Sequence, residues 1–184
     1  IRLAGAVDEI RQLIEKLNVP FVATWNALDL TASKNPLNMG LTGTAGQRGG
    51  NLTVQNCDLL LAIGCHMSTP LTGLNFNTYA REAKRIVVDI DRSELDFETV
   101  RVDLPVQADA KDFISALLKE DVQLSGIGWW RDKCAKYKTY NFILPEWKSQ
   151  KAKVNPYVFI DTLSDELNGD DVIVVDGGGT VLFM

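Results

Sequence analysis

The chain has 184 residues, of which 46% are hydrophobic and 23% charged, a balance that supplies the core of one domain, or of one domain and part of another. Its net charge of -5 argues against a nucleic-acid surface, because such surfaces need clustered positive charge. Three cysteines without metal-ligand spacing and one histidine leave little from which to build a metal site or a catalytic triad. No apolar run approaches the roughly 20 residues that cross a bilayer, so we expect a soluble, cytoplasmic protein.

Strands alternate with helices over the first two thirds of the chain. Apolar residues at helical spacing predict helices over 6–18, 47–56 and 109–119, the last with Asp109 as its N-cap. Short apolar runs predict strands at 20–24, 58–63, 85–90 and around 100–106, separated by loops over 25–36, 65–77 and 91–96. This order is typical of a mostly parallel sheet covered by helices on both faces. The runs FVAT, LLLAI and RIVVDI are apolar at both alternations, as in strands that are buried on both faces.

The last third of the chain predicts a second unit. A helix rich in aromatic residues and lysines is expected over 129–140, followed by a polar, proline-containing linker over 144–155. A helix over 156–167 and a strand over 171–176 then predict the opening of another α/β domain. We therefore expect one domain over 1–143, a linker over 144–155 and the truncated start of a second domain over 156–184.

The two ends of the sequence predict a piece of a longer polypeptide. The chain opens at Ile1, without an initiator methionine, almost directly on a helix. It stops at Met184, shortly after a strand and glycines that normally continue into a packing helix. We also expect a strand before Ile1, whose absence leaves an open sheet edge.

A glycine-rich loop, MGLTGTAGQRGG, precedes the helix predicted over 47–56. Its glycines are Gly40, Gly43, Gly46, Gly49 and Gly50. The N–H groups in the first turn of the helix favour an anion there, such as a phosphate. A flexible turn, in which the glycines only provide positive φ angles, explains the spacing equally well. The loop matches neither the G-x-G-x-x-G nor the G-x-x-x-x-G-K-[ST] pattern.

Polar residues follow the next two predicted strands. Asp89 and Asp91 come at the end of the strand over 85–90, where a carboxylate can accept hydrogen bonds from ribose hydroxyls. For Asp91 a cap on the following turn is the alternative. A lone histidine such as His66, beside a strand end, is more often a hydrogen-bonded surface residue than a catalyst. Cys65 would be reactive only if its pKa were lowered.

A second group of glycines lies near the end of the chain. Gly177, Gly178, Gly179 and Thr180 follow the strand predicted over 171–176. Glycines and a hydroxyl at that position suit a diphosphate, and a simple tight turn explains them equally well.

The order of these segments resembles the thiamine-diphosphate-dependent enzymes of the acetolactate synthase group, which includes 2-oxo acid decarboxylases and carboligases. Five consecutive segments carry the resemblance: PFVATWNAL, MGLTGTAG, NLTVQNCDLLLAIGCHMSTPLTG, AKRIVVDIDRSEL and LPVQADAKDFISALL. They match the central one of the three α/β domains in such chains. The last stretch, NPYVFIDTLSDELNGDDVIVVDGGGTVLFM, is similar over a shorter length to the opening of the diphosphate-binding domain.

The resemblance implies a Rossmann-like (DHS-like) parallel sheet of six strands with helices on both faces. In several members this domain holds an adenine nucleotide portion, as FAD, ADP or a coenzyme A moiety, and in others it is empty. Carried over position by position, the nucleotide-binding candidates are Thr24, Trp25, Gly40, Leu41, Gly64, Asp89, Ile90 and Asp109. Gly177, Gly179 and Thr180 match the region around the diphosphate of the cofactor.

Departures from the family pattern bear on the cofactors. FAD-binding acetolactate synthases have an arginine at the position of His66 and a DDR run at the position of residues 68–70. These departures disfavour FAD and favour an FAD-free carboligase or decarboxylase, for which another adenine nucleotide such as ADP is a possible ligand of this domain. The glutamate that activates the thiazolium and the GDG-type motif that binds magnesium and diphosphate both fall outside this sequence. We assign no catalytic or metal-binding residue, and we expect the chain alone to be inactive.

The resemblance also implies what a parent enzyme does. With thiamine diphosphate and Mg²⁺ it decarboxylates a 2-oxo acid and protonates the product or transfers the unit to an acceptor, as a lyase or a transferase. Its partners are this small molecule and further copies of itself, with no nucleic acid and no membrane. Two alternatives stay open: a stand-alone nucleotide-binding module without chemistry, and a parent enzyme whose central domain binds nothing and only supports assembly.

Overall fold

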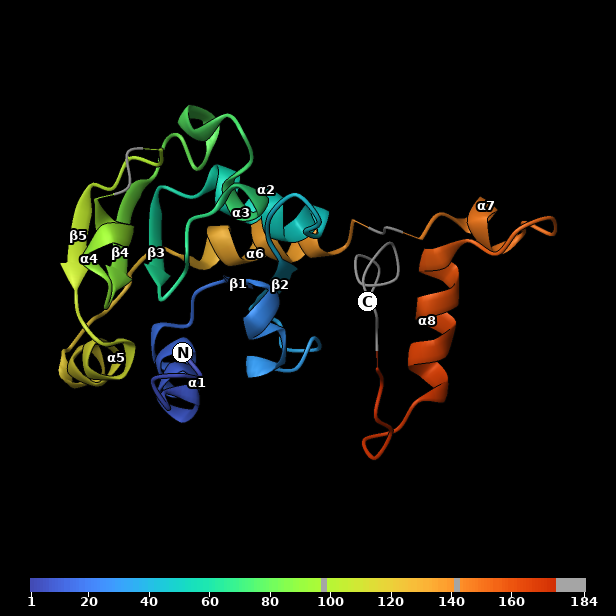
Figure 1. Ribbon diagram of the computed structural model, residues 1–184, viewed down its shortest axis with the longest axis horizontal. Coiled ribbons are helices and arrows are strands. Elements are labelled where there is room, and N and C mark those ends of the chain that lie inside the picture. The colour runs from blue at the N-terminus through green and yellow to red at the C-terminus, as the bar shows by residue number, and fades with distance from the viewer. Residues whose placement is uncertain (97–98, 141–142, 175–184) are drawn as a thin grey trace. The chain divides into compact units, whose positions relative to one another are not determined.

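The computed structural model describes residues 1–96, 99–140 and 143–174. The chain divides into two compact units, Ile1–Tyr140 and Asn141–Met184. The first unit is a mixed α/β fold in which helices flank parallel sheets (Figure 1), so the Rossmann-like fold class expected from the sequence is confirmed. None of the helices described by the structure is long and apolar enough to span a membrane.

The strands of the first unit are short and pair only in parallel. They are β1 (Phe21–Ala23), β2 (Asn38–Leu41), β3 (Leu59–Ile63), β4 (Lys84–Asp89) and β5 (Leu104–Gln107). β1 pairs with β2, whereas β4 lies between β3 and β5 in a separate three-stranded sheet. The resemblance implies six strands in one sheet, and the described part of this unit contains these five in two sheets.

The strand β2 is missing from the sequence prediction, which placed residues 39–41 in a glycine loop. That prediction is wrong, because Leu41 lies opposite Ala23 of β1 in a parallel ladder. Asn38, at the start of β2, is buried, and its Oδ1 accepts a hydrogen bond from the Gly40 amide at 2.9 Å. Asparagine and glycine are depleted in strands, so the tertiary pairing here overrides the local propensity.

Four longer helices surround the strands of the first unit. They are α1 (Val7–Leu17), α2 (Arg48–Asn56), α5 (Ala110–Lys119) and α6 (Gly128–Lys138). Each of them confirms a predicted helix to within two residues at either end. Short helical turns also occupy stretches that were expected to be irregular: η1 (Trp25–Leu30), α3 (Thr69–Thr72), η2 (Phe76–Thr78) and α4 (Arg92–Leu95). Turns of this length are too short to produce a periodic apolar pattern in the sequence.

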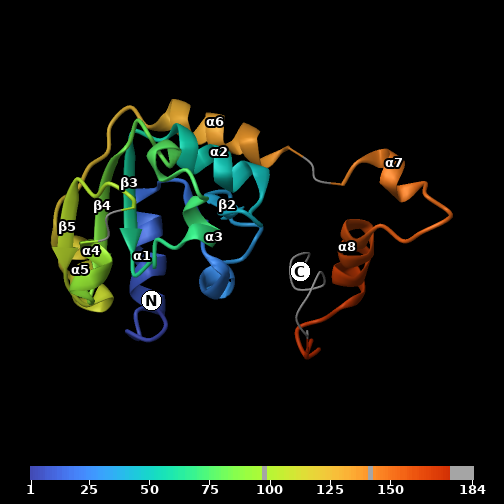
Figure 2. The ribbon, with the colours of Figure 1, turned by 45° about the horizontal axis from the view of Figure 1, so that its top comes forward.

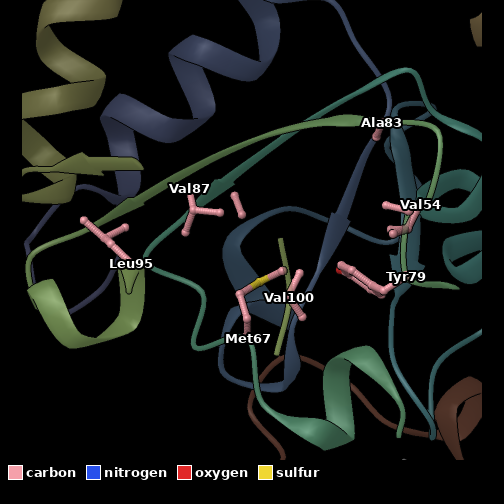
Figure 3. Packing of buried hydrophobic residues seen from close by; sticks show 9 residues of the cluster. Val54, Met67, Tyr79, Ala83, Val87, Leu95 and Val100 are labelled. Carbon is pink, nitrogen blue, oxygen red and sulfur yellow. The ribbon is translucent and has the colours of Figure 1, made fainter. Parts of the chain in front are cut away.

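Each face of the three-stranded sheet has its own hydrophobic cluster. On one face, Leu13 of α1 and Ile114 of α5 are buried together, and Ile63 of β3 packs against them. Figures 1 and 2 show α1 and α5 on this side of the strands, with α2 and α6 on the other. The cluster on the second face (Figure 3) contains Val54, Ala62, Met67, Tyr79, Ala80, Ala83, Val87, Leu95 and Val100. The expected helices on both faces of the sheet are therefore present.

Burial on both faces is found for the middle strand and not for β3. Val87 and Val88 of β4 are 1% and 0% exposed, whereas Leu59 of β3 is 53% exposed. Within the described residues β4 has a strand on each side, while β3 pairs with β4 alone. Because an edge strand keeps part of its surface in water, the apolar run LLLAI is more exposed than its sequence predicts.

The second unit contains α7 (Pro145–Lys148) and α8 (Pro156–Glu166). As the sequence predicts, α8 begins at a proline, and Asn155 Oδ1 accepts hydrogen bonds from the amides of Tyr157 and Val158 at 3.0 and 3.4 Å. The ring of Trp147 stacks on that of Tyr157 with a centroid separation of 5.7 Å. Part of the segment expected to be a linker therefore packs against α8. The assignment of 144–155 as an interdomain linker stays a prediction.

The strand expected over 171–176 is not found in the part that the structure describes. Residues 171–174 form no strand, and Val172 and Val174 are 88% and 91% exposed. The remaining two residues, 175 and 176, lie outside the described part of the chain. A strand needs a hydrogen-bonded neighbour, and residues 143–174 contain no other strand with which this apolar run could pair.

The guanidinium group of Arg85 ties β4 to the loops that flank it. This buried side chain donates hydrogen bonds to the carbonyl oxygens of Tyr79 at 2.6 Å, Ala80 at 3.0 Å and Arg101 at 3.1 Å. Burial, followed by the charge of Arg101, lowers the pKa of the Arg85 group. Ala80 has a φ of 43°, a conformation that alanine rarely adopts, so the bonds from Arg85 hold a strained turn in place.

We expect the substitution Arg85→Ala to lower the free energy of unfolding by about 2–4 kcal/mol, because several buried carbonyl groups lose their donor. Urea denaturation followed by circular dichroism measures this loss. Arg85→Lys keeps the charge without the forked donors, so we expect an intermediate stability. Arg81→Ala, at an exposed side chain, is the control and should change stability by less than about 0.5 kcal/mol. Equal stability of Arg85→Ala and the unchanged chain would contradict this structural role.

Candidate functional site

The carboxyl ends of the strands gather the candidate residues of the three-stranded sheet. Gly64 follows β3, Asp89 ends β4, and Asp109 comes two residues after β5. Because these strands are parallel, the three residues lie at one edge of the sheet. Backbone hydrogen bonds join the strand ends there, from the Gly64 amide to the Val88 carbonyl at 2.8 Å and from the Ala108 amide to the Asp89 carbonyl at 3.1 Å.

The two-stranded sheet gathers the other candidates in the same way. Thr24 and Trp25 follow β1, while Gly40 and Leu41 end β2. The loops after β2 and β3 touch, because the amide of Thr44 donates a hydrogen bond to the carbonyl oxygen of Pro70 at 2.8 Å. The carboxyl ends of both sheets therefore lie on the same side of the first unit. Two apolar candidates are in contact with solvent, since Trp25 is 40% and Ile90 67% exposed.

Two side chains from the start of α2 hold the glycine loop. Asn51 Oδ1 accepts a hydrogen bond from the Gly43 amide, and Asn51 Nδ2 donates one to the Gly43 carbonyl, both at 2.9 Å. Gln47 Oε1 accepts a hydrogen bond from the Leu41 amide at 3.3 Å. Gly40 and Gly43 have φ angles of 93° and 116°, which only glycine adopts without strain. The loop is thus a fixed turn, and these two glycines have a conformational role.

Other glycines of the loop allow α2 to approach β2 closely. A Cβ atom at Gly50 would lie 2.5 Å from the carbonyl oxygen of Leu41. A Cβ atom at Gly46 would lie 2.7 Å from the amide nitrogen of Gly43. Neither distance leaves room for a side chain, so backbone packing by itself accounts for glycine at these positions. The anion-binding interpretation of the loop stays a prediction.

The two aspartates at the carboxyl end of β4, Asp89 and Asp91, accept hydrogen bonds from different groups. Asp91 Oδ1 accepts hydrogen bonds from the amide of Ser93 at 2.9 Å and from its hydroxyl at 2.8 Å, and these bonds lower the pKa of the Asp91 carboxyl. The alternative in which Asp91 caps the following turn is therefore confirmed. Asp89 is half-buried, and its Oδ1 accepts a hydrogen bond from the Asp91 amide at 3.0 Å. Of the two, Asp89 remains the candidate for a ribose contact.

Asp109 is the N-cap of α5, as the sequence predicts. Its Oδ1 accepts hydrogen bonds from the amides of Lys111 and Asp112 at 2.7 and 3.3 Å. This oxygen satisfies two amides of the first turn of the helix. A nucleotide contact by Asp109 stays a prediction, and it would have to involve the other carboxylate oxygen.

His66 and residues 68–70 are the positions at which the resemblance implies charged side chains in FAD-binding members. His66 Nδ1 lies 2.6 Å from Glu94 Oε2, and the His66 side chain is 63% exposed. This is the hydrogen-bonded surface histidine that the sequence favours over a catalyst. Residues 68–70 lead into α3, where the carbonyl of Pro70 accepts hydrogen bonds from the amide and the hydroxyl of Thr44. The segment holds the glycine loop through its backbone, and residues 68–70 carry no charged side chain.

The thiol of Cys65, after the carboxyl end of β3, and that of Cys57, before its amino end, are not activated. Burial raises the pKa of the Cys65 thiol, and it raises the pKa of the Cys57 thiol to about 11. The thiolate is the nucleophilic form of cysteine, so both side chains stay protonated and inert at neutral pH. The condition under which Cys65 would be reactive is therefore not met.

The diphosphate candidates Gly177, Gly179 and Thr180 lie outside the described residues, so their role stays a prediction. Within residues 1–96, 99–140 and 143–174, no group of three or more His, Cys, Asp or Glu side chains could hold a metal ion.

Comparison with known protein families identifies the family of this chain. Residues 1–117 match the family described as thiamine pyrophosphate enzyme, central domain. The chain belongs to this family. The match to the thiamine pyrophosphate enzymes includes every strand of the first unit and most of α5, so the resemblance carried by five sequence segments is confirmed.

Among the curated relatives are large subunits of acetolactate synthase. The chain is 29% identical over 190 residues to the "Probable acetolactate synthase large subunit" of Methanocaldococcus jannaschii, a match that covers 99% of this chain and 32% of the relative. It is 31% identical over 180 residues to the acetolactate synthase large subunit of Corynebacterium glutamicum, covering 96% and 28%. With the isozyme 3 large subunit of Escherichia coli it shares 25% over 194 residues, covering 98% and 32%. The chain therefore spans about a third of the length of these relatives.

Sequence reasoning missed the polar side chains that hold this edge together. Gln47 and Asn51 are four residues apart, a spacing that places both on one face of α2 and that could have indicated their shared role. Glu94 gave no such signal, because 28 residues separate it from its partner His66.

We expect Asp109→Ala to lower the free energy of unfolding by about 1 kcal/mol, because the first amides of α5 lose their acceptor. Urea denaturation measures the change. Asp109→Ser keeps a capping oxygen and is the matched control, which should stay within about 0.5 kcal/mol of the unchanged chain. If the alanine and serine variants were equally stable, the cap would not contribute to the stability of this fold.

Proposed function

We propose that this chain is the central domain, with the opening of the diphosphate-binding domain, of a thiamine-diphosphate-dependent enzyme similar to acetolactate synthase. The observation that carries the proposal is the match of residues 1–117 to the central domain of that family. Alignment of 99% and 96% of the chain with two acetolactate synthase large subunits supports it. The parent enzyme decarboxylates a 2-oxo acid and transfers the resulting unit to an acceptor or protonates it. It is a cytoplasmic homo-oligomer of the transferase or lyase class.

The groups that carry out catalysis are assigned to other parts of the parent enzyme. Thiamine diphosphate, when bound, supplies the carbanion chemistry. Its activation requires a carboxylate within hydrogen-bond reach, and we place this glutamate in the pyrimidine-binding domain. We place the magnesium ion and most of the diphosphate site in the third domain, with Gly177, Gly179 and Thr180 as the contacts from this chain. The chain by itself is then inactive.

We assign the carboxyl edge of the sheets to an adenine nucleotide such as ADP. Asp89 supports this assignment, because its Oδ1 is bonded to the Asp91 amide and Oδ2 is left to accept a ribose hydroxyl. The other contacts come from the remaining candidates at the strand ends, the glycine loop among them. The pairing of His66 with Glu94 and the uncharged turn at 68–70 favour a nucleotide other than FAD.

A second candidate function is a central domain that binds no nucleotide and only supports the assembly of the parent enzyme. The structure of the glycine loop favours it, because Asn51 already binds both backbone groups of Gly43. The capping of α5 by Asp109 favours it as well. Nucleotide binding by the unchanged protein therefore separates the two candidates.

We expect Asp89→Ala to weaken the binding of ADP by about tenfold or more, because a hydrogen bond to a charged acceptor is lost. Isothermal titration calorimetry on the native polypeptide measures the affinity. Asp89→Asn keeps an oxygen for the Asp91 amide but replaces the second acceptor by a donor, so it should lose affinity with the turn intact. Glu82→Ala, an exposed residue before β4, is the control. Unchanged affinity in both Asp89 variants would rule out the ribose contact, and no binding by the unchanged protein would favour the structural domain.

The native polypeptide that carries this sequence tests the assignment to an enzyme. Mass spectrometry of the polypeptide captured from its source cells should show three domains of roughly 150–200 residues each, with a GDG-type motif after this segment. The purified polypeptide should release carbon dioxide from a 2-oxo acid only when thiamine diphosphate and Mg²⁺ are present, and the 184-residue chain alone should release none. Binding of ADP without any decarboxylation across a panel of 2-oxo acids would instead indicate a stand-alone nucleotide-binding module.

A further inference from the structure

The connection between β1 and β2, residues 24–37, is held in place mainly by polar contacts. It begins with Thr24 and Trp25 and leads into β2, which carries Gly40 and Leu41. Within residues 24–37, all of which the structure describes, Leu30 alone is buried, and the other residues are half-buried or exposed. A segment with so little apolar burial gains little from the hydrophobic effect, so hydrogen bonds to its backbone determine where it lies.

Two helices hold the two halves of this connection separately. From α1, Arg11 Nε donates a hydrogen bond to the carbonyl oxygen of Leu30 at 2.7 Å. From the last residue of α6, Lys138 Nζ donates hydrogen bonds to the carbonyl oxygens of Ser33 at 2.9 Å and of Asn35 at 2.7 Å. In the sequence, 105 and 103 residues separate the lysine from these two partners. Lys138 therefore anchors the second half of the connection, which leads directly into β2.

The carbonyl group of Asn35 connects Lys138 to the start of β2. Its oxygen also accepts a hydrogen bond from the amide of Asn38 at 3.1 Å, so it is shared between the lysine and the first residue of the strand. Asn38 is buried, and its Oδ1 accepts the hydrogen bond from the Gly40 amide at 2.9 Å. The contacts thus run from Lys138 through Asn35 and Asn38 to Gly40, one of the candidates at the carboxyl edge.

The helix α6 is itself fixed against α2, the helix that holds the glycine loop. Figures 1 and 2 show the two helices side by side, and Thr53 Oγ1 of α2 donates a hydrogen bond to Sγ of the buried Cys134 of α6 at 3.6 Å. A Cβ atom at Gly49 would lie 3.1 Å from the carbonyl oxygen of Tyr137 and 3.3 Å from the Cα atom of Lys138. The absence of a side chain at Gly49 therefore allows α2 to approach the end of α6 closely, and this contact sets the position of Lys138.

The helix α2 also holds the opposite end of β2. Gln47 Oε1 accepts a hydrogen bond from the Leu41 amide, and Asn51 Oδ1 accepts one from the Gly43 amide. α6 thus acts on β2 by two routes, through Lys138 before the strand and through α2 after it. Because α6 begins at Gly128, it follows the segment 1–117 that matches the family, and these contacts are not part of that match.

We propose that Lys138 is a positioning residue for the carboxyl edge of the two-stranded sheet. By binding the turn at residues 33–35, its ammonium group fixes where β2 starts, and with it where Gly40 and Leu41 lie at the other end of the strand. Lysine suits this role because one ammonium group has three donors and can bind two carbonyl groups at once. What the edge binds rests on the proposed adenine nucleotide, whereas the position of β2 does not.

The test replaces Lys138 by methionine, which keeps an unbranched side chain but has no donor. Hydrogen–deuterium exchange of the native polypeptide is measured by mass spectrometry over residues 33–42, with residues 84–89 of β4 as the internal reference. We expect Lys138→Met to speed exchange over 33–42 by about tenfold or more and to leave 84–89 unchanged. Lys138→Arg keeps a charged donor and should stay within about threefold of the unchanged protein. Lys136→Met, at an exposed position of the same helix, is the matched control and should change neither segment.

The affinity for ADP is a readout that a contribution to overall stability alone would not change. Isothermal titration calorimetry on the same variants measures it. We expect Lys138→Met to weaken binding by about fivefold, because a displaced β2 no longer holds Gly40 and Leu41 in place for the ligand. The midpoint of thermal unfolding should shift by less than about 2 °C. Lys138→Arg should recover most of the affinity, and Lys136→Met should keep all of it.

Three results would overturn the proposal. Equal exchange over 33–42 in Lys138→Met and the unchanged protein would mean that the lysine does not position β2. Equally faster exchange over 33–42 and 84–89 would mean that it contributes only to overall stability. Unchanged affinity for ADP in Lys138→Met, where the unchanged protein binds ADP, would mean that the edge does not depend on the lysine. If the unchanged protein does not bind ADP, the nucleotide assignment fails, and faster exchange confined to 33–42 still supports Lys138 as the positioning residue.

Discussion

The parallel pairing of β4 with β3 and β5 is the constraint on which the candidate site depends. Parallel strands bring their carboxyl ends to one edge, so residues that are 20 or more positions apart in the sequence, such as Gly64 and Asp89, become neighbours. The same pairing leaves Val87 and Val88 1% and 0% exposed, with Val87 in one hydrophobic cluster and Ile63 of β3 packed against the other. Arg85 reinforces it by binding the carbonyl groups of the loops at the amino end of the strand.

The glycine loop shows how one segment can satisfy a structural and a functional explanation together. Its positive φ angles and the close contact between Gly50 and Leu41 are required for α2 to pack against β2. The same geometry directs the first turn of α2 toward the edge at which strands of such folds bind nucleotides. Because packing alone already demands glycine there, the glycine pattern is poor support for a ligand. The proposed ribose contact therefore rests on the position of Asp89 and not on the glycines.

The division of the sheet into two parts explains why burial differs from strand to strand. β4, with neighbours on both sides, reaches the burial that its apolar sequence predicts. β1 and β3 have similar sequences but one neighbour each within the described residues, and their side chains stay partly in water. The hydrophobic effect favours covering the apolar run of β3.

The sequence by itself determined the four longer helices of the first unit, most of the strands, the cap at Asp109, the proline at the start of α8 and the family to which the chain belongs. These features depend on local periodicity, on capping residues and on the order of motifs, all of which can be recognised in the sequence without a structure. The sequence could not predict β2, the single helical turns or the exposure of β3, because strand pairing and burial depend on residues that are far away in the sequence. Only the tertiary structure decided that Asp91 caps a turn while Asp89 faces the strand ends, that Asn51 holds Gly43, and that Cys65 is inert. The fold decides each of these outcomes, because it brings particular groups within hydrogen-bond distance and removes others from water. The spacing of residues in the sequence does not contain this information.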